Sequence, residues 1–179
     1  MDESSTRVSS RHTEGLLIAI SVGVFFLLVG AIFVINSPPN QTNLLDRIIA
    51  LLRGFDTTQV HNLGVYLPAP VHPLAHSTVY TAVEQFSFFW GLFQIIILAL
   101  RFAAGSPLNK KAEAVSNFVF WVGASFLISN FLLDTRWVAV WHDELIIWFV
   151  FWSMIIMILG FSLIVRAIVL AAAPKRHLI

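Results

Sequence analysis

The chain has 179 residues, of which 58% are hydrophobic and only 12% are charged, and its mean hydropathy is +0.81. This composition is too apolar for a soluble domain and predicts an integral membrane protein. The net charge of +1 argues against nucleic acid as a partner, and the absence of cysteine excludes thiol catalysis, disulfides and thiolate metal sites.

The first predicted span covers residues 15–36 and follows a polar tail, residues 1–14, that we expect to be disordered. About 20 apolar residues are enough for one crossing of the hydrocarbon core of a bilayer. The polar stretch that begins at Asn36 does not resemble a signal-peptide cleavage site. We therefore expect a retained anchor that packs at the periphery of the other helices.

The connection over residues 36–76 is predicted to contain an amphipathic helix at residues 43–54. At helical spacing its polar side chains share one face, and its leucines and isoleucines share the other. Because this helix is too short to cross, we expect it to lie flat at the membrane interface or to pack on the spans. The segment after it contains Pro68, Pro70 and Pro73 and is expected to be extended.

The second predicted span, residues 77–101, carries nearly all its polar and small side chains on one stripe. The stripe runs at alternating spacings of four and three residues: Tyr80, Glu84, Ser87, Gly91, Gln94, Leu98 and Arg101. A helix that is apolar elsewhere and has small, hydrogen-bonding residues in such a seam is typical of a membrane span that faces other helices.

The third and fourth predicted spans cover residues 113–133 and 143–172. The same spacing gives the third span the seam Ser116, Phe120, Gly123, Leu127, Asn130 and Asp134. It gives the fourth the seam His142, Ile146, Phe149, Ser153, Ile156, Gly160, Leu163 and Ala167. The predicted fold is therefore an all-α integral membrane protein, a four-transmembrane-helix bundle over residues 15–173 with an amphipathic helix in its first loop.

Positive charge is distributed unevenly between the predicted loops. Of the 11 lysines and arginines, all but Arg47, Arg53 and Arg136 lie in the two tails, at the C-terminal end of the fourth span, or around the loop between the second and third spans. The positive-inside rule then predicts a cell-membrane protein whose tails, residues 1–14 and 174–179, are both cytoplasmic. The amphipathic helix would face outward.

Glu84 is the best single candidate for a functional residue. It would lie about 9 Å inside the apolar layer, where a carboxylate costs roughly 2 to 3 kcal/mol and needs a partner or a proton. Tyr80 precedes it by one turn, and Asn130 and His142 lie near the outer ends of their spans. These residues could form a cluster at the outer mouth of the bundle together with His76 and Asp134.

Three interpretations of this cluster compete. One is a divalent metal site with ligands from His72, His76, Glu84, His142 and Asp143. The second is a site at which Glu84 handles protons or ions beside His142. The third, which we prefer, is a hydrogen-bonded polar clamp that fixes the register of the helices.

Aromatic residues in the middle spans offer another possible pocket. Trp90 and Trp121 could line a site for a quinone, a carotenoid or a lipid tail together with four phenylalanines, Phe86, Phe88, Phe89 and Phe93. Packing within the core and against lipid is the more common use of such side chains.

Two classes of function follow from these features. The favoured one is a non-catalytic accessory or interaction subunit of a larger membrane complex, partnered by the bilayer and by other membrane subunits or copies of itself. The alternative is a small membrane enzyme or an ion or proton transporter that uses the outer histidine and carboxylate cluster. We favour the first because Glu84 is the only acid well inside a predicted span and no catalytic motif is present.

Overall fold

The computed structural model describes residues 3–39, 42–60, 64–134 and 136–172, with side chains from Glu14 onward. It is mostly helical. The elements in chain order are α1 (Glu3–Ile35), α2 (Leu44–Arg53), β1 (Phe55–Gln59), β2 (Tyr66–Pro70), the 3₁₀-helix η1 (Pro73–His76), α3 (Ser77–Ala103), α4 (Leu108–Leu127), the π-helix η2 (Ile128–Leu133), α5 (Arg136–Trp141) and α6 (Glu144–Ala171). Within the described residues, four helical stretches are long and apolar enough to cross a membrane: Glu14–Ile35, Pro73–Ala103, Leu108–Leu133 and Glu144–Ala171.

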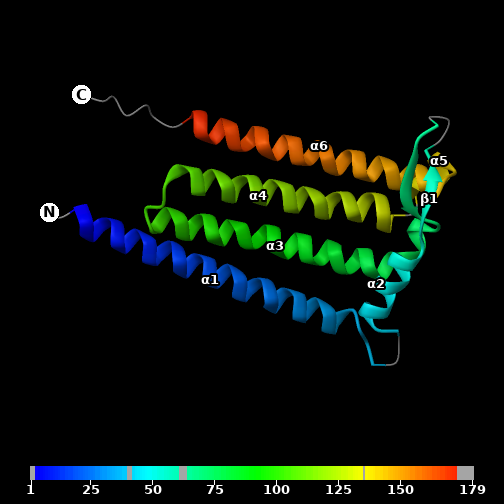
Figure 1. The fold of residues 1–179 in the computed structure, drawn as a ribbon, viewed down its shortest axis with the longest axis horizontal. Coiled ribbons are helices and arrows are strands. Elements are labelled where there is room, and N and C mark those ends of the chain that lie inside the picture. The colour runs from blue at the N-terminus through cyan, green and yellow to red at the C-terminus, as the bar shows by residue number, and fades with distance from the viewer. Residues whose placement is uncertain (1–2, 40–41, 61–63, 135, 173–179) are drawn as a thin grey trace.

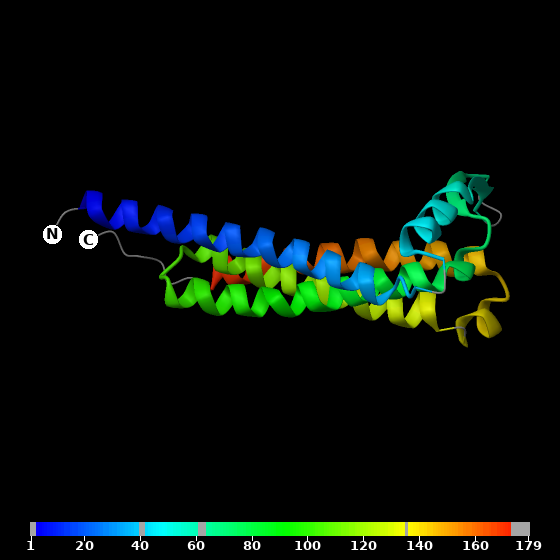
Figure 2. The ribbon, with the colours of Figure 1, turned by 90° about the horizontal axis from the view of Figure 1, so that it is seen from below.

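The four long helices lie side by side in a row, in the order α1, α3, α4 and α6 (Figure 1). Each helix contacts mainly its neighbour in that row, and the view turned by 90° shows them overlapping in a shallow layer (Figure 2). The four long helices that we predicted are therefore arranged as a row, with α1 and α6 at opposite edges. α2, the two strands and α5 gather at one end, and α1 begins and α6 ends at the other.

The α3 and α4 backbones approach each other closely at Gly91. A Cβ atom built on Gly91 would lie 2.8 Å from Val122 Cγ2 and 3.1 Å from the Val122 backbone nitrogen, so only glycine allows this spacing. The predicted stripe of the second span is confirmed here, because Tyr80, Ser87, Gly91 and Gln94 are all buried. Small residues bring the two backbones together, as is usual between helices in membranes.

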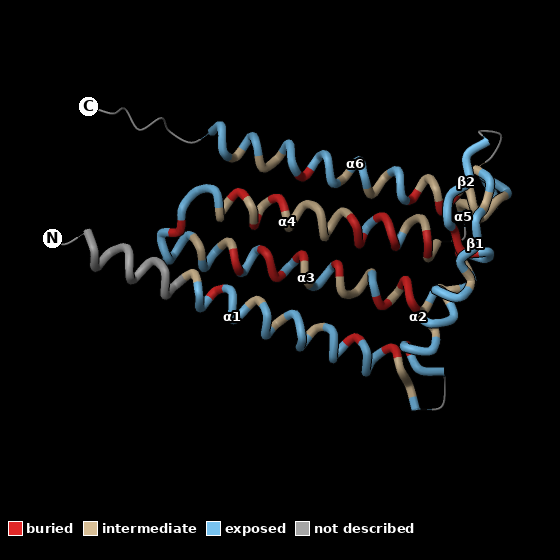
Figure 3. The backbone as a smooth tube through the Cα atoms, viewed as in Figure 1, coloured by how far each residue is buried: buried red, intermediate tan, exposed pale blue. Residues whose placement is uncertain are grey.

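The predicted seam of the fourth span is wrong. The buried residues of α6 are Ile147, Trp148, Phe151 and Ser162, whereas Ser153 of the predicted seam is exposed. The physical reason is that α6 is apolar around nearly its whole circumference, so no polar side chain marks the face that packs. Figure 3 shows the result as sparse buried positions along α6 and closely spaced ones along α3 and α4.

The all-α prediction is also wrong for one segment, because β1 and β2 form an antiparallel hairpin. The backbone nitrogen of Val71 donates to the Gly54 carbonyl at 2.9 Å, which makes these two residues a hydrogen-bonded pair. Bonded and non-bonded pairs alternate along such a ladder, so Pro68 and Pro70 occupy positions whose nitrogen needs no partner across the hairpin. The extended conformation predicted from the prolines is confirmed, and the pairing was missed.

α2 forms at the predicted place and its apolar residues point in two directions. Leu44 is buried against Ile32 of α1 and Val79 of α3. Leu45 and Leu52 remain 55% and 64% exposed. The helix therefore packs on the row along one side and presents leucines outward along another.

Two helices begin earlier than predicted. α1 starts at Glu3, where we expected a disordered tail, and α4 starts at Leu108 rather than at residue 113. Extending an existing helix by a turn costs little once it is nucleated, so polar residues next to an apolar span readily continue it. The predicted tail at residues 174–179 lies outside the described residues.

Candidate functional site

Glu84 lies between α3 and α4 and has a partner that the sequence did not indicate. The hydroxyl of Ser125 donates a hydrogen bond to Glu84 Oε1 at 2.9 Å. Ser125 is buried and Glu84 is half-buried. Because the two residues come from different helices, this bond ties α3 to α4 where the row is most tightly packed.

The Glu84 carboxyl also lines an open groove of about 260 Å³, which we call the Glu84 groove. Its walls are formed by Glu84 and Phe88 of α3 and by Val122, Ser125, Phe126, Ser129 and Asn130 of α4 and η2. Asn130, a predicted neighbour of Glu84, is thus in the same groove. Its side-chain amide donates to the Phe126 carbonyl at 2.8 Å, within its own helix.

Tyr80 is placed elsewhere, in the core between α3 and α6. Its ring centre lies 6.4 Å from that of Trp148, and its hydroxyl is buried. Among the described side chains, this hydroxyl and Glu144 Oε2 are both buried atoms with no hydrogen-bond partner. Tyr80 therefore belongs to the packing under the hairpin and does not line the Glu84 groove.

The histidines and aspartates of the predicted metal site are dispersed. His142 is exposed at the junction of α5 and α6, with a positive φ of 54°. Asp143 caps α6, since its Oδ1 accepts from the Leu145 backbone nitrogen at 2.8 Å, and His72 is exposed before η1. No group of three or more histidines or acids within the described residues could hold a metal ion, so the five predicted ligands are not brought together.

Asp134, also expected in the outer cluster, is engaged by Arg136. The Arg136 Nε donates to Asp134 Oδ2 at 2.6 Å, and the Arg136 backbone nitrogen donates to Oδ1 at 2.9 Å. The side-chain hydrogen bond from Arg136 lowers the pKa of Asp134 below its ordinary value, and the backbone hydrogen bond adds to this effect. The pair shapes the connection between η2 and α5.

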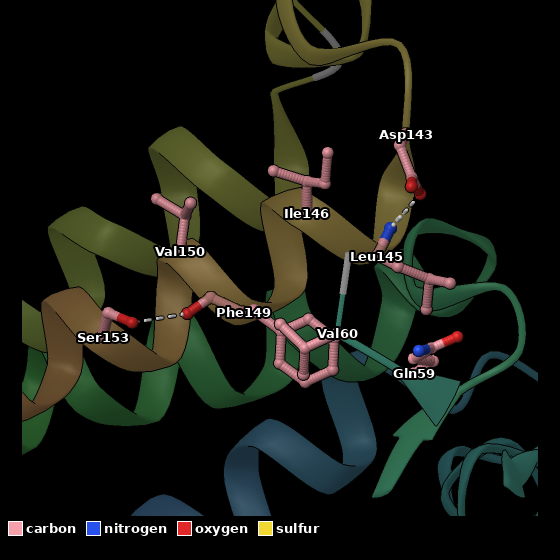
Figure 4. A pocket seen from close by; sticks show the side chains of 8 residues that line it. All are labelled: Gln59, Val60, Asp143, Leu145, Ile146, Phe149, Val150 and Ser153. Carbon is pink, nitrogen blue, oxygen red and sulfur yellow. Dashed lines mark hydrogen bonds between the residues drawn. The ribbon is translucent and has the colours of Figure 1, made fainter. Parts of the chain in front are cut away.

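A separate cavity of about 270 Å³ lies between the end of β1 and the start of α6 (Figure 4). Its polar side chains are largely engaged within α6, because Asp143 caps that helix and the Ser153 hydroxyl donates to the Phe149 carbonyl at 2.9 Å. Gln59 and Val60 close the cavity from the hairpin. The described residues that line it form a mainly apolar hollow, and among them no nucleophile is hydrogen-bonded to a base.

The aromatic residues considered as a cofactor pocket contact one another. Phe86 stacks on Trp90 at 6.0 Å between ring centres, and Trp121 meets Phe86 edge-on at 5.8 Å. Phe25 of α1 lies 5.7 Å from Trp90. These rings fill the contacts of α3 with α1 and α4.

Three further hydrogen bonds join elements that are distant in sequence. Asn36 donates to Gln85 Oε1 at 2.9 Å, Ser106 donates to Glu14 Oε1 at 2.7 Å, and Arg166 donates to Asn109 Oδ1 at 2.9 Å. The sequence did not indicate any of these three pairings. These hydrogen bonds fix the axial positions of the helices relative to one another.

The described residues thus define a row of helices apolar enough to span a membrane, with one acid-bearing groove between the inner two. No protein-family model, curated protein sequence or solved structure matches the chain.

Proposed function

We propose that the chain is a non-catalytic accessory subunit of a larger membrane complex, and that a helix of a partner subunit docks in the Glu84 groove. The groove carries the proposal. A carboxyl in the hydrocarbon layer costs roughly 2 to 3 kcal/mol, and it can accept about four hydrogen bonds. Among the described residues only Ser125 donates to it. A lysine, arginine or amide on a partner helix would supply the remaining donors.

In this proposal the four long helices cross the cell membrane, both ends of the chain are cytoplasmic, and α2 rests on the outer surface. The exposed Leu45, Ile49 and Leu52 of α2 support this placement, because they recur at spacings of four and three and form one apolar edge. Glu84 would then lie in the outer half of the membrane.

A partner helix explains the groove better than catalysis does. Asp143 caps α6, Asp134 is paired with Arg136, and His72 and His142 are exposed in separate places. The open row also leaves broad apolar surfaces on α1 and α6, with Leu27 of α1 at 73% and Ile156 of α6 at 67% exposed. Such surfaces fit contact with lipid and with neighbouring subunits.

The direct test is native mass spectrometry of the chain gently extracted from its own membrane. We expect another subunit at fixed stoichiometry. Glu84→Gln removes the charge and Ser129→Trp fills the groove, and each should reduce the recovered partner by about tenfold, which corresponds to about 1.4 kcal/mol. Glu113→Gln makes the same chemical change near the start of α4, outside the Glu84 groove, and should leave the partner bound.

Three outcomes separate the possibilities. Loss of the partner in both groove variants, with Glu113→Gln unchanged, supports docking at Glu84. A partner of the chain's own mass makes the complex a homo-oligomer. Recovery of the chain alone, or equal partner recovery in every variant, contradicts the proposal.

The topology has its own test, because the chain contains no cysteine. Single cysteines at Thr57 and Lys110 should react with a membrane-impermeant reagent from opposite sides. Labelling of both from the same side would overturn the proposed orientation.

A further inference from the structure

Two cavities adjoin where α2 crosses the ends of α1 and α3. A small polar one, of about 80 Å³, is lined by Arg47, His76 and Thr78 among others. A larger apolar one, of about 230 Å³, lies next to it between α1, α2 and α3. Val79 lines both. The pair therefore has a hydrogen-bonding end beside α2 and an apolar end along the long helices.

The polar end suits a phosphate group. The half-buried Arg47 is held in place, because its Nε donates to the Thr42 carbonyl at 3.1 Å and its Nη1 donates to Thr78 Oγ1. Since Thr78 Oγ1 accepts that bond, its hydroxyl hydrogen can be donated to a ligand. His76 lines the same cavity. Of the described residues that line the two cavities, none is acidic, so the local charge favours an anion.

The apolar end suits a hydrocarbon chain. Its wall includes Ile32 and Phe33 of α1, Ile48 of α2, and Val83 and Phe86 of α3. The lining residues of α3 run from Val79 to Phe86, about 10 Å along the helix axis. The cavity is not enclosed, so a longer acyl chain can extend out of it.

We infer that the two cavities form a site for one phospholipid, with its phosphate on Arg47, His76 and Thr78 and an acyl chain in the apolar groove. On binding, the acyl chain of the lipid moves from one apolar environment to another. It therefore contributes little to the discrimination between different lipids. The phosphate exchanges water for a fixed guanidinium and hydroxyl, so selectivity resides at the polar end. The site shares no lining residue with the Glu84 groove, so it stands or falls separately from partner docking.

The test compares two lipids that differ only in the headgroup. The chain in detergent micelles is titrated with phosphatidylglycerol and with a diacylglycerol of the same acyl chains, and the bound lipid is counted by native mass spectrometry. The wild-type protein should bind one molecule of phosphatidylglycerol with an affinity about tenfold higher than that for one molecule of diacylglycerol. Arg47→Gln should remove that preference.

Arg53→Gln is the matched control, because Arg53 lies on the same helix, is exposed, and lines neither cavity. It should keep the preference. Val83→Trp fills the apolar end without touching Arg47 and should weaken binding of both lipids, which tests the site even if Arg47→Gln unfolds.

Equal binding of the two lipids by wild type would overturn the inference. So would an equal loss in Arg47→Gln and Arg53→Gln, which would point to general surface charge. Displacement of phosphatidylglycerol by inorganic phosphate would make this a site for a free anion instead of a lipid. Unchanged lipid binding by Val83→Trp would show that the acyl chain does not occupy the apolar cavity.

Discussion

The inner and outer helices of the row are built differently. In the spanning windows of α3 and α4, 28% and 33% of residues are buried, against 6% in α1 and in α6. The inner pair also carries Gly91, Ser125 and Glu84, which give close approach and a hydrogen bond between helices. The inner pair therefore supplies most of the packing between helices, whereas the outer helices leave most of their apolar surface exposed.

Small residues alone do not produce a helix contact. α1 has Gly23 and Gly30 one heptad apart, yet a Cβ atom added at either would meet no other atom within 4 Å. In a membrane, apolar faces gain nothing by leaving lipid, so association needs close packing or hydrogen bonds on both partners. α3 and α4 meet that condition within this chain.

The largest expected effect comes from overfilling the inner contact. Gly91→Leu must displace Val122 and its backbone, and we expect a loss of about 3 kcal/mol in the free energy of unfolding. Gly30→Leu makes the same change on α1 in open space and should alter stability by less than about 0.5 kcal/mol. Steric trapping in bicelles measures both. Equal losses in the two variants would mean that the inner and outer helices do not differ in this way.

A smaller effect is expected from removing the hydrogen bond between the inner helices. Ser125→Ala leaves Glu84 Oε1 without its donor and should cost about 1 kcal/mol. Ser153→Ala removes a hydroxyl that bonds only within α6 and should be nearly neutral. A double-mutant cycle with Glu84→Leu should assign roughly 0.6 kcal/mol or more to the Ser125 and Glu84 pair. A coupling near zero would show that the bond does not hold the helices together.

The sequence was informative where polar residues mark a helix face. The stripe through Ser87, Gly91 and Gln94 predicted the buried side of α3. Because α6 is apolar all round, the sequence did not indicate which face of this helix packs. Trp148 and Phe151 are on the face that is buried. Helix length and hydropathy are local properties, so the positions of the long helices could be predicted without knowing their neighbours.

The candidate site was harder to predict because pairing is not local. Glu84 stood out from its depth alone, but Ser125 looks like any small residue in an apolar helix until α3 and α4 are placed side by side. The hairpin was missed for a related reason, since the prolines of β2 argue against a strand unless the register is known. The metal hypothesis relied on His72 and His142, which the fold leaves in separate, exposed places.

The smallest effect concerns the ion pair outside the row, between the half-buried Asp134 and the exposed Arg136. Because Arg136 lowers the pKa of Asp134 in the folded state, the pair contributes stability above the ordinary aspartate pKa of about 3.9. That contribution is lost as the pH falls through the lower folded value. Hydrogen exchange of the α5 amides should therefore be faster in Asp134→Asn than in wild type at neutral pH, and the ratio of the two rates should approach one in acid. A ratio that is independent of pH would show that the pair does not hold α5, and Arg136→Gln should reproduce the effect of Asp134→Asn if it does.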